Sequence, residues 1–570
     1  MRVLGIEGTA WCASAALHDS GSDTTFIESD AYEPDSGGIH PREAAEHMSE
    51  AIPAVVDAVL THATDEYGPD AIDAVAFSRG PGLGPCLRTV GTAARALAGA
   101  LDVPLVGVNH MVAHLEIGRH ESGFSNPVCL NASGANAHLL GYHDGRYRVL
   151  GETMDAGVGN ALDKFTRHVG WSHPGGPKVE AAASRADADA DLLDLPYVVK
   201  GMDFSFSGIS SAANDAVDDG VSVEEVCFSL QEHVFAVLTE VSERALSLTG
   251  ADELVLGGGV GQNARLREML ATMCAERGAR FHAPEPRYLR DNAGMIAVLG
   301  AKMAAVGDTV PIRESAIDPN FRPDEVPVTW REGEPSVVRD AGSDRRDGEA
   351  GNGTADGDAD HRGAEAVVDV RPPDDAPGAG ESTDPLTAGR RVRKRRVPKS
   401  YRHPGLDATL RRDRTVSEAR LTSEARRAGV PTPLVYDVDV ADATLTLQHV
   451  GDRDLAAALS PSRARTVGRH LAGLHGAGVV HGDPTTRNVR VEAGADGDDD
   501  RVFLIDFGLG YHSAHVEDHA MDLHVFEGSV VATATDPDPV IEAFEAGYRE
   551  VGAERVLDRL RTVEGRGRYR

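Results

Sequence analysis

Apolar and polar positions divide the chain into two patterned regions with an unpatterned stretch between them. Up to about residue 322, short apolar runs alternate with Ala-rich stretches: residues 1–6 and 71–78 read as strands, and residues 92–101 as a helix. Strands that alternate with helices are typical of an α/β domain. Residues 333–360 hold mostly Gly, Asp, Glu and Ala. Such a segment buries too little surface to offset its ordering entropy, so we predict a flexible acidic linker.

These shifts in composition predict three segments. They are a first domain at residues 1–325, an acidic disordered linker at 326–360 and a second domain at 361–570. The length of 570 residues supports the division, because a single hydrophobic core rarely extends beyond ~250–300 residues. A second polar stretch, residues 372–386, reads as a loop inserted in the second domain.

The charge balance indicates the environment of the protein. The formal net charge is −33, and lysine occurs only at Lys164, Lys178, Lys200, Lys302, Lys394 and Lys399. Acidic, Lys-poor chains suggest a halophile, because at molar salt a Debye length of about 3 Å screens the self-repulsion. The five cysteines show no C-x-x-C and no paired spacing, and no stretch approaches eighteen consecutive apolar residues. We therefore expect a cytoplasmic protein with reduced thiols and no membrane partner.

Two motifs near the C-terminus carry a kinase signature. His481-Gly482-Asp483 is followed by Asn488, and a strand-like run at 502–505 leads into Asp506-Phe507-Gly508. In this arrangement Asp483 orients or deprotonates the attacking hydroxyl, while Asn488 and Asp506 hold magnesium at the phosphates of ATP. Either motif alone is weak, but their order and the strand between them make chance unlikely.

A second candidate site lies in the first domain. His110 and His114 are four residues apart, which places both imidazoles on one face of a helix, where they could share a metal; two helix-surface histidines would show the same spacing. Asp291, at the start of a later helix, is a plausible third ligand. Residues 254–256 run as a strand into three glycines and a helix carrying Asn263, an arrangement that can hold phosphate. Glycine turns at 133–136 and 175–177 add to this pattern.

The order of these motifs resembles the tRNA threonylcarbamoyladenosine synthase family. The resemblance covers residues 1 to about 325 and rests on the segments 5–9, 79–84, 109–114, 133–136, 159–164, 175–180, 257–263 and 290–292. The remainder, with segments 363–366, 394–396, 401–404 and 415–420, is similar to the RIO-like atypical serine/threonine kinase that partners this synthase in the archaeal and eukaryotic KEOPS complex. The whole chain resembles the archaeal fusion of the two.

The resemblance implies an α/β and α+β multidomain chain. Its first part would have an actin/Hsp70-like (ASKHA) two-lobed ATPase fold, and its second part a small atypical protein-kinase fold. The implied reaction transfers a threonylcarbamoyl group from its adenylate to the exocyclic amine of the adenosine 3′ to the anticodon, in tRNAs reading codons that begin with A. The implied partners are tRNA, other KEOPS subunits and the enzyme making threonylcarbamoyl-AMP.

The resemblance also assigns residues. One iron or zinc ion would be bound by His110, His114 and Asp291. The adenylate site would be lined by Asn131, Ala132, Ser133, Gly134, Ala135, Asp163, Gly176, Glu180 and Asn263. In the kinase, magnesium and ATP would be bound by Gly363, Lys394, Glu418, Asn488 and Asp506, with Asp483 catalytic.

The sequence departs from the family pattern in both parts. Asn131 stands where the family has a Tyr that approaches the metal; its amide either leaves room for a water or substrate oxygen there or bonds the neighbouring turn. Ala135 replaces the second glycine of its turn. The kinase has no G-x-G-x-x-G loop and no A-P-E segment before the helical stretch at 517–526, so an ATPase or self-phosphorylating role competes with protein kinase activity.

Several alternatives stay open at this point. A sugar-kinase-like or chaperone-like ATPase under kinase control is the rival function, which would not need the histidine pair. His512, His515, His519 and His524 could form a second metal site or be ordinary surface histidines. The Arg-rich stretches at 390–396 and 566–570 are candidate tRNA phosphate contacts, although such charge is usually only solvated.

Overall fold

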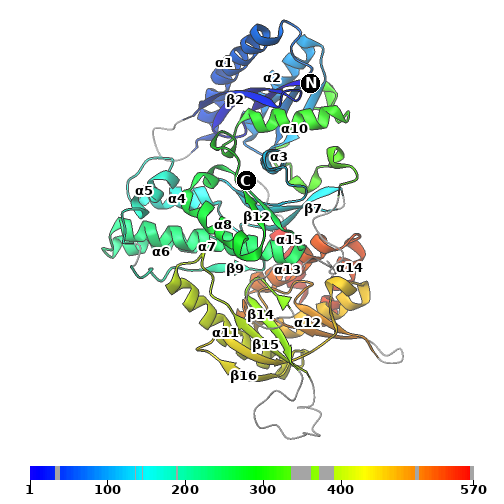
Figure 1. Ribbon diagram of the computed structural model, residues 1–570. Coiled ribbons are helices and arrows are strands. Elements are labelled where there is room, and N and C mark those ends of the chain that lie inside the picture. The colour runs from blue at the N-terminus through cyan, green and yellow to red at the C-terminus, as the bar shows by residue number, and fades with distance from the viewer. Residues whose placement is uncertain are drawn as a thin grey trace, which may run out of the picture.

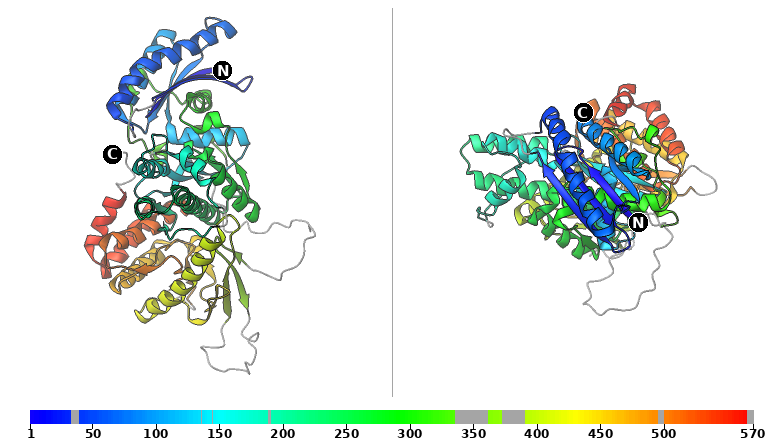
Figure 2. Two further views of the ribbon diagram at one scale, coloured as in Figure 1. Left: turned by 90° about the vertical axis from the view of Figure 1, so that its left-hand side faces the viewer. Right: turned by 90° about the horizontal axis from the view of Figure 1, so that it is seen from above.

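The structure is a computed structural model in which the molecule is elongated (Figures 1 and 2). It describes residues 1–32, 39–134, 136–143, 145–187, 190–334, 361–371, 390–494 and 500–564. Two α/β lobes and a third, kinase-like part follow one another along the long axis, with the N-terminal lobe at one end (Figure 2, left). Outside the described residues lie the predicted linker beyond Glu334, the predicted loop at 372–386, Ala135 and the Arg-rich tail at 566–570.

The first lobe is a five-stranded mixed sheet with helices packed on it. The strand order is β3-β2-β1-β4-β5; β1, β2 and β3 form an antiparallel meander, and β4 and β5 run parallel to β1. The elements are β1 (Arg2–Glu7), β2 (Cys12–Asp19), β3 (Thr24–Ala31), α1 (Pro41–Tyr67), β4 (Ala74–Gly80), α2 (Gly84–Leu101), β5 (Leu105–Asn109) and α10 (Ala293–Ala305). Helix α2 begins earlier than the sequence predicts, because Pro85 in its first turn needs no hydrogen-bond acceptor there.

The second lobe repeats the topology of the first. Its strand order is β8-β7-β6-β11-β12, again an antiparallel meander of three consecutive strands followed by two strands parallel to the first of them. The strands are β6 (Val128–Ala132), β7 (Ala137–His143), β8 (Arg146–Glu152), β11 (Glu253–Gly257) and β12 (Arg280–His282). The shared order shows two duplicated lobes, as the prediction of an actin/Hsp70-like fold requires.

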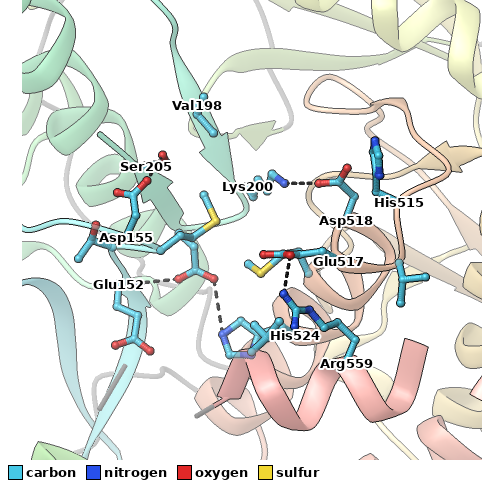
Figure 3. Close-up of a pocket in the computed structure, with 16 residues that line it drawn as sticks. Glu152, Asp155, Val198, Lys200, Ser205, His515, Glu517, Asp518, His524 and Arg559 are labelled. Atoms are coloured by element: carbon cyan, nitrogen blue, oxygen red, sulfur yellow. Dashed lines mark hydrogen bonds and ion pairs between the residues drawn. The ribbon is translucent and has the colours of Figure 1, made fainter. Parts of the chain in front are cut away.

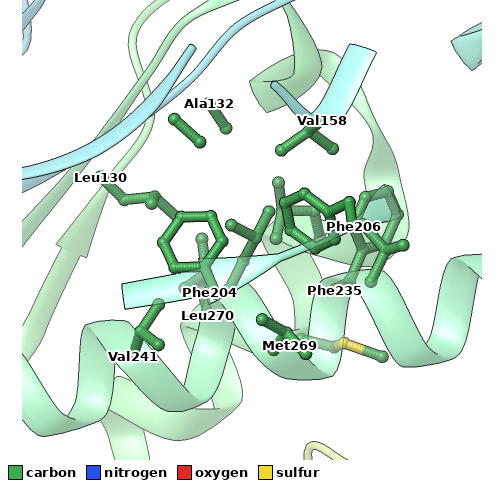
Figure 4. Packing of buried hydrophobic residues seen from close by; sticks show 14 of the residues in the cluster. Leu130, Ala132, Val158, Phe204, Phe206, Phe235, Val241, Met269 and Leu270 are labelled. Carbon is green, nitrogen blue, oxygen red and sulfur yellow. The ribbon is translucent and has the colours of Figure 1, made fainter. Parts of the chain in front are cut away.

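Helices of the second lobe surround a core that helix α7 dominates. The helices are α4 (Val158–His168), α5 (Gly176–Ala183), α6 (Ser207–Asp218), α7 (Val223–Thr249), α8 (Ala264–Arg277) and α9 (Pro286–Leu289), with a hairpin of β9 (Val198–Lys200) and β10 (Asp203–Ser205). Phe204 and Phe206 pack against Phe235 of α7 and Leu130 of β6 (Figure 4). Tyr401 and Ala532 of the kinase-like part join this same cluster. The apolar core therefore continues from the second lobe into the third part.

The third part combines an antiparallel sheet with a mostly helical region. The sheet has the order β13-β14-β15-β17-β16, and α11 packs against it. Its elements are β13 (His361–Arg362), β14 (Ala366–Arg371), β15 (Arg391–Arg396), α11 (Pro404–Arg427), β16 (Val435–Asp439) and β17 (Thr444–Gln448). The helical region holds β18 (Arg453–Asp454), α12 (Pro461–Gly476), β19 (Val479–Val480), β20 (Val489–Glu492), β21 (Arg501–Leu504), β22 (Tyr511–His512), α13 (Val516–Thr533), α14 (Asp538–Val551) and α15 (Glu554–Glu564).

Two further features bear on the sequence predictions. Arg331 is fully buried and donates to the Tyr147 hydroxyl at 3.0 Å, so the first part remains packed beyond residue 325. The domain boundaries stay a prediction. Within the described ranges, no helix has the length and apolar character that spanning a membrane requires. All five cysteines are free and buried.

Candidate functional site

Helix α3 (His110–Ser122) carries the histidine pair between the two sheets (Figure 1). It begins directly after β5, because the Asn109 side chain accepts hydrogen bonds from the backbone amides of Met111 and Val112 at 3.0 and 3.1 Å. The spacing of four residues brings the His110 and His114 rings to 4.8 Å between centroids. Both are buried, so the reading of two surface histidines is wrong.

Asp291 completes the cluster from the segment that precedes α10. Its Oδ1 lies 3.4 Å from His110 Nε2 and 3.6 Å from His114 Nε2. One ligand atom from each residue lies within 4.8 Å of the others, and no other group of this kind occurs among the described residues. The ring nitrogens of His114 are buried without a hydrogen-bond partner in the described structure. This site fits a zinc or iron ion, because it offers two imidazoles and a carboxylate, and one of the imidazoles has buried nitrogens without a hydrogen-bond partner.

Glu7 is a member of this site that sequence reasoning missed. Its carboxylate is fully buried at the end of β1, with Oε2 at 3.2 Å from His110 Nδ1 and Oε1 accepting from the Thr9 amide at 2.8 Å. Burial opposes protonation of His110, but Glu7 and Asp291 outweigh it and raise the pKa of this histidine to about 10. A carboxylate behind a histidine fixes the ring and leaves the other nitrogen for a metal. The available signal was an acidic residue that directly follows the apolar run at residues 3–6 of the first strand.

Glycine turns lie at the carboxyl ends of the parallel strands next to the cluster. Strands β6 and β11 pair in parallel, with Asn131 opposite Gly257, so both end at one edge of the sheet. Gly258 has φ +84°, and a Cβ there would come within 2.4 Å of the Ala132 carbonyl oxygen. A Cβ on Gly257 would contact His114 at 3.4 Å. The carboxyl edge of parallel strands is where α/β folds bind ligands, and here it adjoins the histidines.

The predicted adenylate residues gather around these turns. The Ser133 and Gly134 carbonyls accept from the amides of Gly159 and Asn160 at the start of α4. Asp163 Oδ1 accepts from the Gly175 amide at 2.6 Å and so holds the turn before Gly176. Glu180 Oε1 accepts from the Ala264 amide at 2.9 Å, next to Asn263, whose side chain caps α8. The structure therefore brings these residues into two adjoining groups in the second lobe.

Asn131 makes few contacts among the described residues, and it does not bond the neighbouring turn as one of the two sequence-based alternatives predicted. It is fully buried, and its Nδ2 lies 3.5 Å from the sulfur of Met111, the neighbour of His110. Its Oδ1 has no hydrogen-bond partner in the described structure and lies beside the Gly257–Gly258 turn. The amide oxygen is thus free to accept from a water or a substrate group.

The kinase-like residues also converge. Lys394 and Arg396 alternate with outward residues on β15, so both point to the same face. Lys394 Nζ lies 2.9 Å from Glu418 Oε1 on α11 and 2.7 Å from Asp506 Oδ1. Burial raises the pKa of Asp506, but Lys394 and Arg396 outweigh it and hold the pKa below its usual range. The Lys394–Glu418 ion pair is the arrangement that kinase ATP sites require. Gly363 lies in the turn before β14.

The loop that contains Asp483 is anchored by a residue outside the predicted set. Asp522 of α13 accepts from the amides of His481 and Gly482, both at 2.7 Å. Asn488 Nδ2 donates to Asp483 Oδ2 at 2.9 Å, which joins two predicted residues. Burial raises the pKa of Asp483 to about 7. The backbone of this loop is therefore held by the buried carboxylate of Asp522.

The first part of the chain also contacts this loop. Arg244 Nη1 of α7 lies 2.9 Å from Asp483 Oδ2, the Gly201 amide donates to the Gly482 carbonyl at 2.8 Å, and Arg487 Nε donates to the Leu248 carbonyl at 2.9 Å. The sequence motifs do not predict any of these contacts. The available signal for the contact of Arg244 was the presence of charged residues within α7, a helix that is otherwise largely apolar.

One cavity is separate from both clusters. It has a volume of about 650 Å³, lies between the second lobe and α13 and α15, and is lined by none of the residues predicted for the transfer site or the ATP site. Ion pairs join Lys200 to Asp518 and Arg559 to Glu517 in its walls (Figure 3). His512 pairs with Glu424 and His524 with Asp203, so the four C-terminal histidines do not converge on a second metal site.

Fold and site define a class: a two-lobed α/β domain with a buried His-His-Asp cluster, joined to a kinase-like domain. The family model for tRNA N6-adenosine threonylcarbamoyltransferase matches residues 23–298. A "probable bifunctional tRNA threonylcarbamoyladenosine biosynthesis protein" of Halobacterium salinarum is 68% identical, over 100% of this chain and 99% of its own length. The protein of the same name from Methanospirillum hungatei is 48% identical, over 100% and 99% respectively. The chain belongs to this family of bifunctional tRNA threonylcarbamoyladenosine biosynthesis proteins, which confirms the resemblance.

Proposed function

We propose that the first part transfers a threonylcarbamoyl group from threonylcarbamoyl-AMP to the exocyclic amine of the adenosine 3′ to the anticodon, in tRNAs reading codons that begin with A. The amine nitrogen bonds to the carbamoyl carbonyl carbon, the bond from this carbon to the phosphate oxygen breaks, and AMP leaves with the bonding electrons. The amine loses one proton. The observation that carries the proposal is the convergence of His110, His114 and Asp291 beside the glycine turns.

The residues present suit this reaction. His110, His114 and Asp291 would hold one iron or zinc ion, which when bound supplies a Lewis acid next to the carbonyl or phosphate. Asn131, Ala132, Ser133, Gly134, Ala135, Asp163, Gly176, Glu180 and Asn263 would hold the adenylate. The positive dipole ends of α4 and α8 suit its phosphate, although amides in the first turns of both helices already bond Ser133, Gly134, Glu180 and Asn263. The rival sugar-kinase-like or chaperone-like ATPase gives no reason for a buried histidine pair.

We infer that the second part hydrolyses ATP with magnesium and thereby regulates the complex. Lys394 and Glu418 would position the phosphates, and Asn488 and Asp506 would hold magnesium. The turn that contains Gly363 would cover the phosphates, and Asp483 would orient the attacking water. ATP hydrolysis is favoured over phosphorylation of a protein because α7 contacts Asp483, where a peptide hydroxyl would have to approach. We further propose a cytoplasmic protein that works with tRNA, other KEOPS subunits and the enzyme making threonylcarbamoyl-AMP.

Mass spectrometry of tRNA nucleosides tests the transfer reaction in cells. Depletion of the protein should remove threonylcarbamoyladenosine, and the wild-type chain should restore it, whereas a His110→Ala, His114→Ala variant should not. His120→Ala is a matched control in the last turn of the same helix, and it should restore the modification fully. An unchanged level of threonylcarbamoyladenosine after depletion would overturn the proposal.

A further inference from the structure

We propose that Arg244, a residue of the first part, is a catalytic residue of the kinase-like ATP site, which would then be composed of residues from both parts. The inference rests on the proposed ATP hydrolysis and names a residue that the kinase motifs do not contain. It predicts that the second part hydrolyses ATP efficiently only while α7 is docked on it.

The guanidinium of Arg244 meets three carboxylates from three elements. Nε lies 3.1 Å from Glu240 Oε1 on the same helix, Nη1 lies 2.9 Å from Asp483 Oδ2 in the catalytic loop, and Nη2 pairs with Glu365 in the turn between β13 and β14. The side chain is only 10% exposed. A permanent positive charge is therefore fixed, largely away from water, at the group that would orient the attacking water.

The pattern of partners argues against a role in the interface alone. Glu240 also pairs with Arg402 at 2.6 Å and Arg414 at 3.0 Å, and Glu365 also pairs with Arg414. These two carboxylates would keep a cation without Arg244. Asp483, by contrast, has no other cation within 4.0 Å in the part of the chain that the structure describes. The catalytic loop is the one partner that depends on this arginine.

The loop is fixed to the first part on both sides of Asp483. Before it, the Gly201 amide of the β9–β10 turn donates to the Gly482 carbonyl, and after it, Arg487 donates to the Leu248 carbonyl at the end of α7. A phosphate-stabilising group has to be held in place before the reaction, since reorganisation then costs nothing at the transition state. These contacts provide that preorganisation.

The chemistry gives Arg244 a defined task. The oxygen of a water molecule bonds to the γ-phosphorus, the bond from this phosphorus to the bridging oxygen breaks, and the electrons stay on ADP. The proton of the water passes to Asp483 and then to the released phosphate. Charge spreads over the γ-phosphoryl oxygens as this bond breaks, and an arginine beside them stabilises it. The γ-phosphate would take the place of Glu365 at Nη2.

Steady-state ATP hydrolysis by the full-length protein tests the inference. Arg244→Ala should lower kcat by about 10³-fold, the lower end for arginines that act on a transferred phosphoryl group, with a much smaller change in ATP affinity. Millimolar guanidinium ion should restore part of the rate, because it replaces the missing charge. Arg265→Ala is the matched control: Arg265 pairs with Glu232 of α7 and also reaches from the first part to the kinase-like part, at the Tyr401 carbonyl, but no contact with Asp483 occurs in the described structure. Its rate should be unchanged.

The outcomes separate this inference from the proposed function. An unchanged or increased rate in Arg244→Ala, an equal loss in Arg265→Ala, or a loss that guanidinium does not restore would overturn the role of Arg244. Absence of ATP hydrolysis in the wild-type protein, or full hydrolysis in Asp506→Asn, would instead overturn the proposed ATP hydrolysis.

Discussion

Two clusters of charged and polar side chains differ in which part of the chain supplies their residues: the metal-type cluster in the first part and the kinase-like cluster around Asp483. Glu7, His110, His114 and Asp291 all belong to the first part, although they are far apart in sequence. Around Asp483, by contrast, Asn488 comes from the second part and Arg244 from the first. The four residues of the metal-type cluster therefore come from the first part alone, whereas residues of both parts meet at Asp483.

The largest expected effect is the loss of metal. His110→Ala with His114→Ala removes two of three ligands, so the purified protein should lose its bound metal and its tRNA modification activity together. ATP hydrolysis should survive, because none of the contacts of these cluster residues in the described structure involves the kinase-like residues. Elemental analysis and hydrolysis assays on one preparation measure both. Stoichiometric iron or zinc in the double variant would refute the site.

The next largest effect concerns the ATP site. Lys394→Ala and Asp506→Asn should each abolish ATP hydrolysis, since one removes the cation and the other a magnesium ligand. Metal content in the first part should not change. Arg395→Ala, on the outward face of the same strand, is the control and should hydrolyse ATP normally. Loss of the transferase metal in either ATP-site variant would contradict the separation of the two sites.

Glu7 should have an intermediate effect. Glu7→Gln keeps the size of the side chain but weakens the bond to His110 Nδ1, so metal affinity should fall about 10–100-fold. Competition titration with a chelator measures this without reference to activity. Glu28→Gln on β3 offers a comparison from the same sheet. Equal affinities in the wild-type and Glu7→Gln proteins would show that Glu7 does not orient His110.

Asn131 should have the smallest effect. Its neutral amide is a weaker ligand than an imidazole, so Asn131→Ala should change metal affinity far less than His114→Ala. The same titration compares the two variants. A comparable loss in both would identify Asn131 as a true ligand.

The comparison also explains what the sequence could predict. A spacing of four residues places His110 and His114 on one helix face wherever that helix lies, and the motifs around Asp483 and Asp506 are equally local. The duplicated lobes and the kinase-like part followed from the resemblance to the family. These predictions depend on short stretches of chain, which is why they were accessible.

The missed residues depend on contacts between distant segments. Glu7 meets His110 across 103 positions, and Arg244 meets Asp483 across 239. Helix α7 is buried on nearly every side, so hydrophobic periodicity does not indicate which face meets which partner. Only the fold determines that Arg244 faces Asp483.

Cleavage of the chain between the two parts tests most directly whether the ATP site is composite. A protease site would be placed within residues 335–360, and metal content and ATP hydrolysis would be measured before cleavage, after cleavage and after separation of the fragments. We predict that the first fragment keeps its metal throughout. ATP hydrolysis should persist in the cleaved pair, disappear from the separated second fragment and return when the first fragment is added, but not when that fragment carries Arg244→Ala. Full ATP hydrolysis by the separated second fragment would contradict the account.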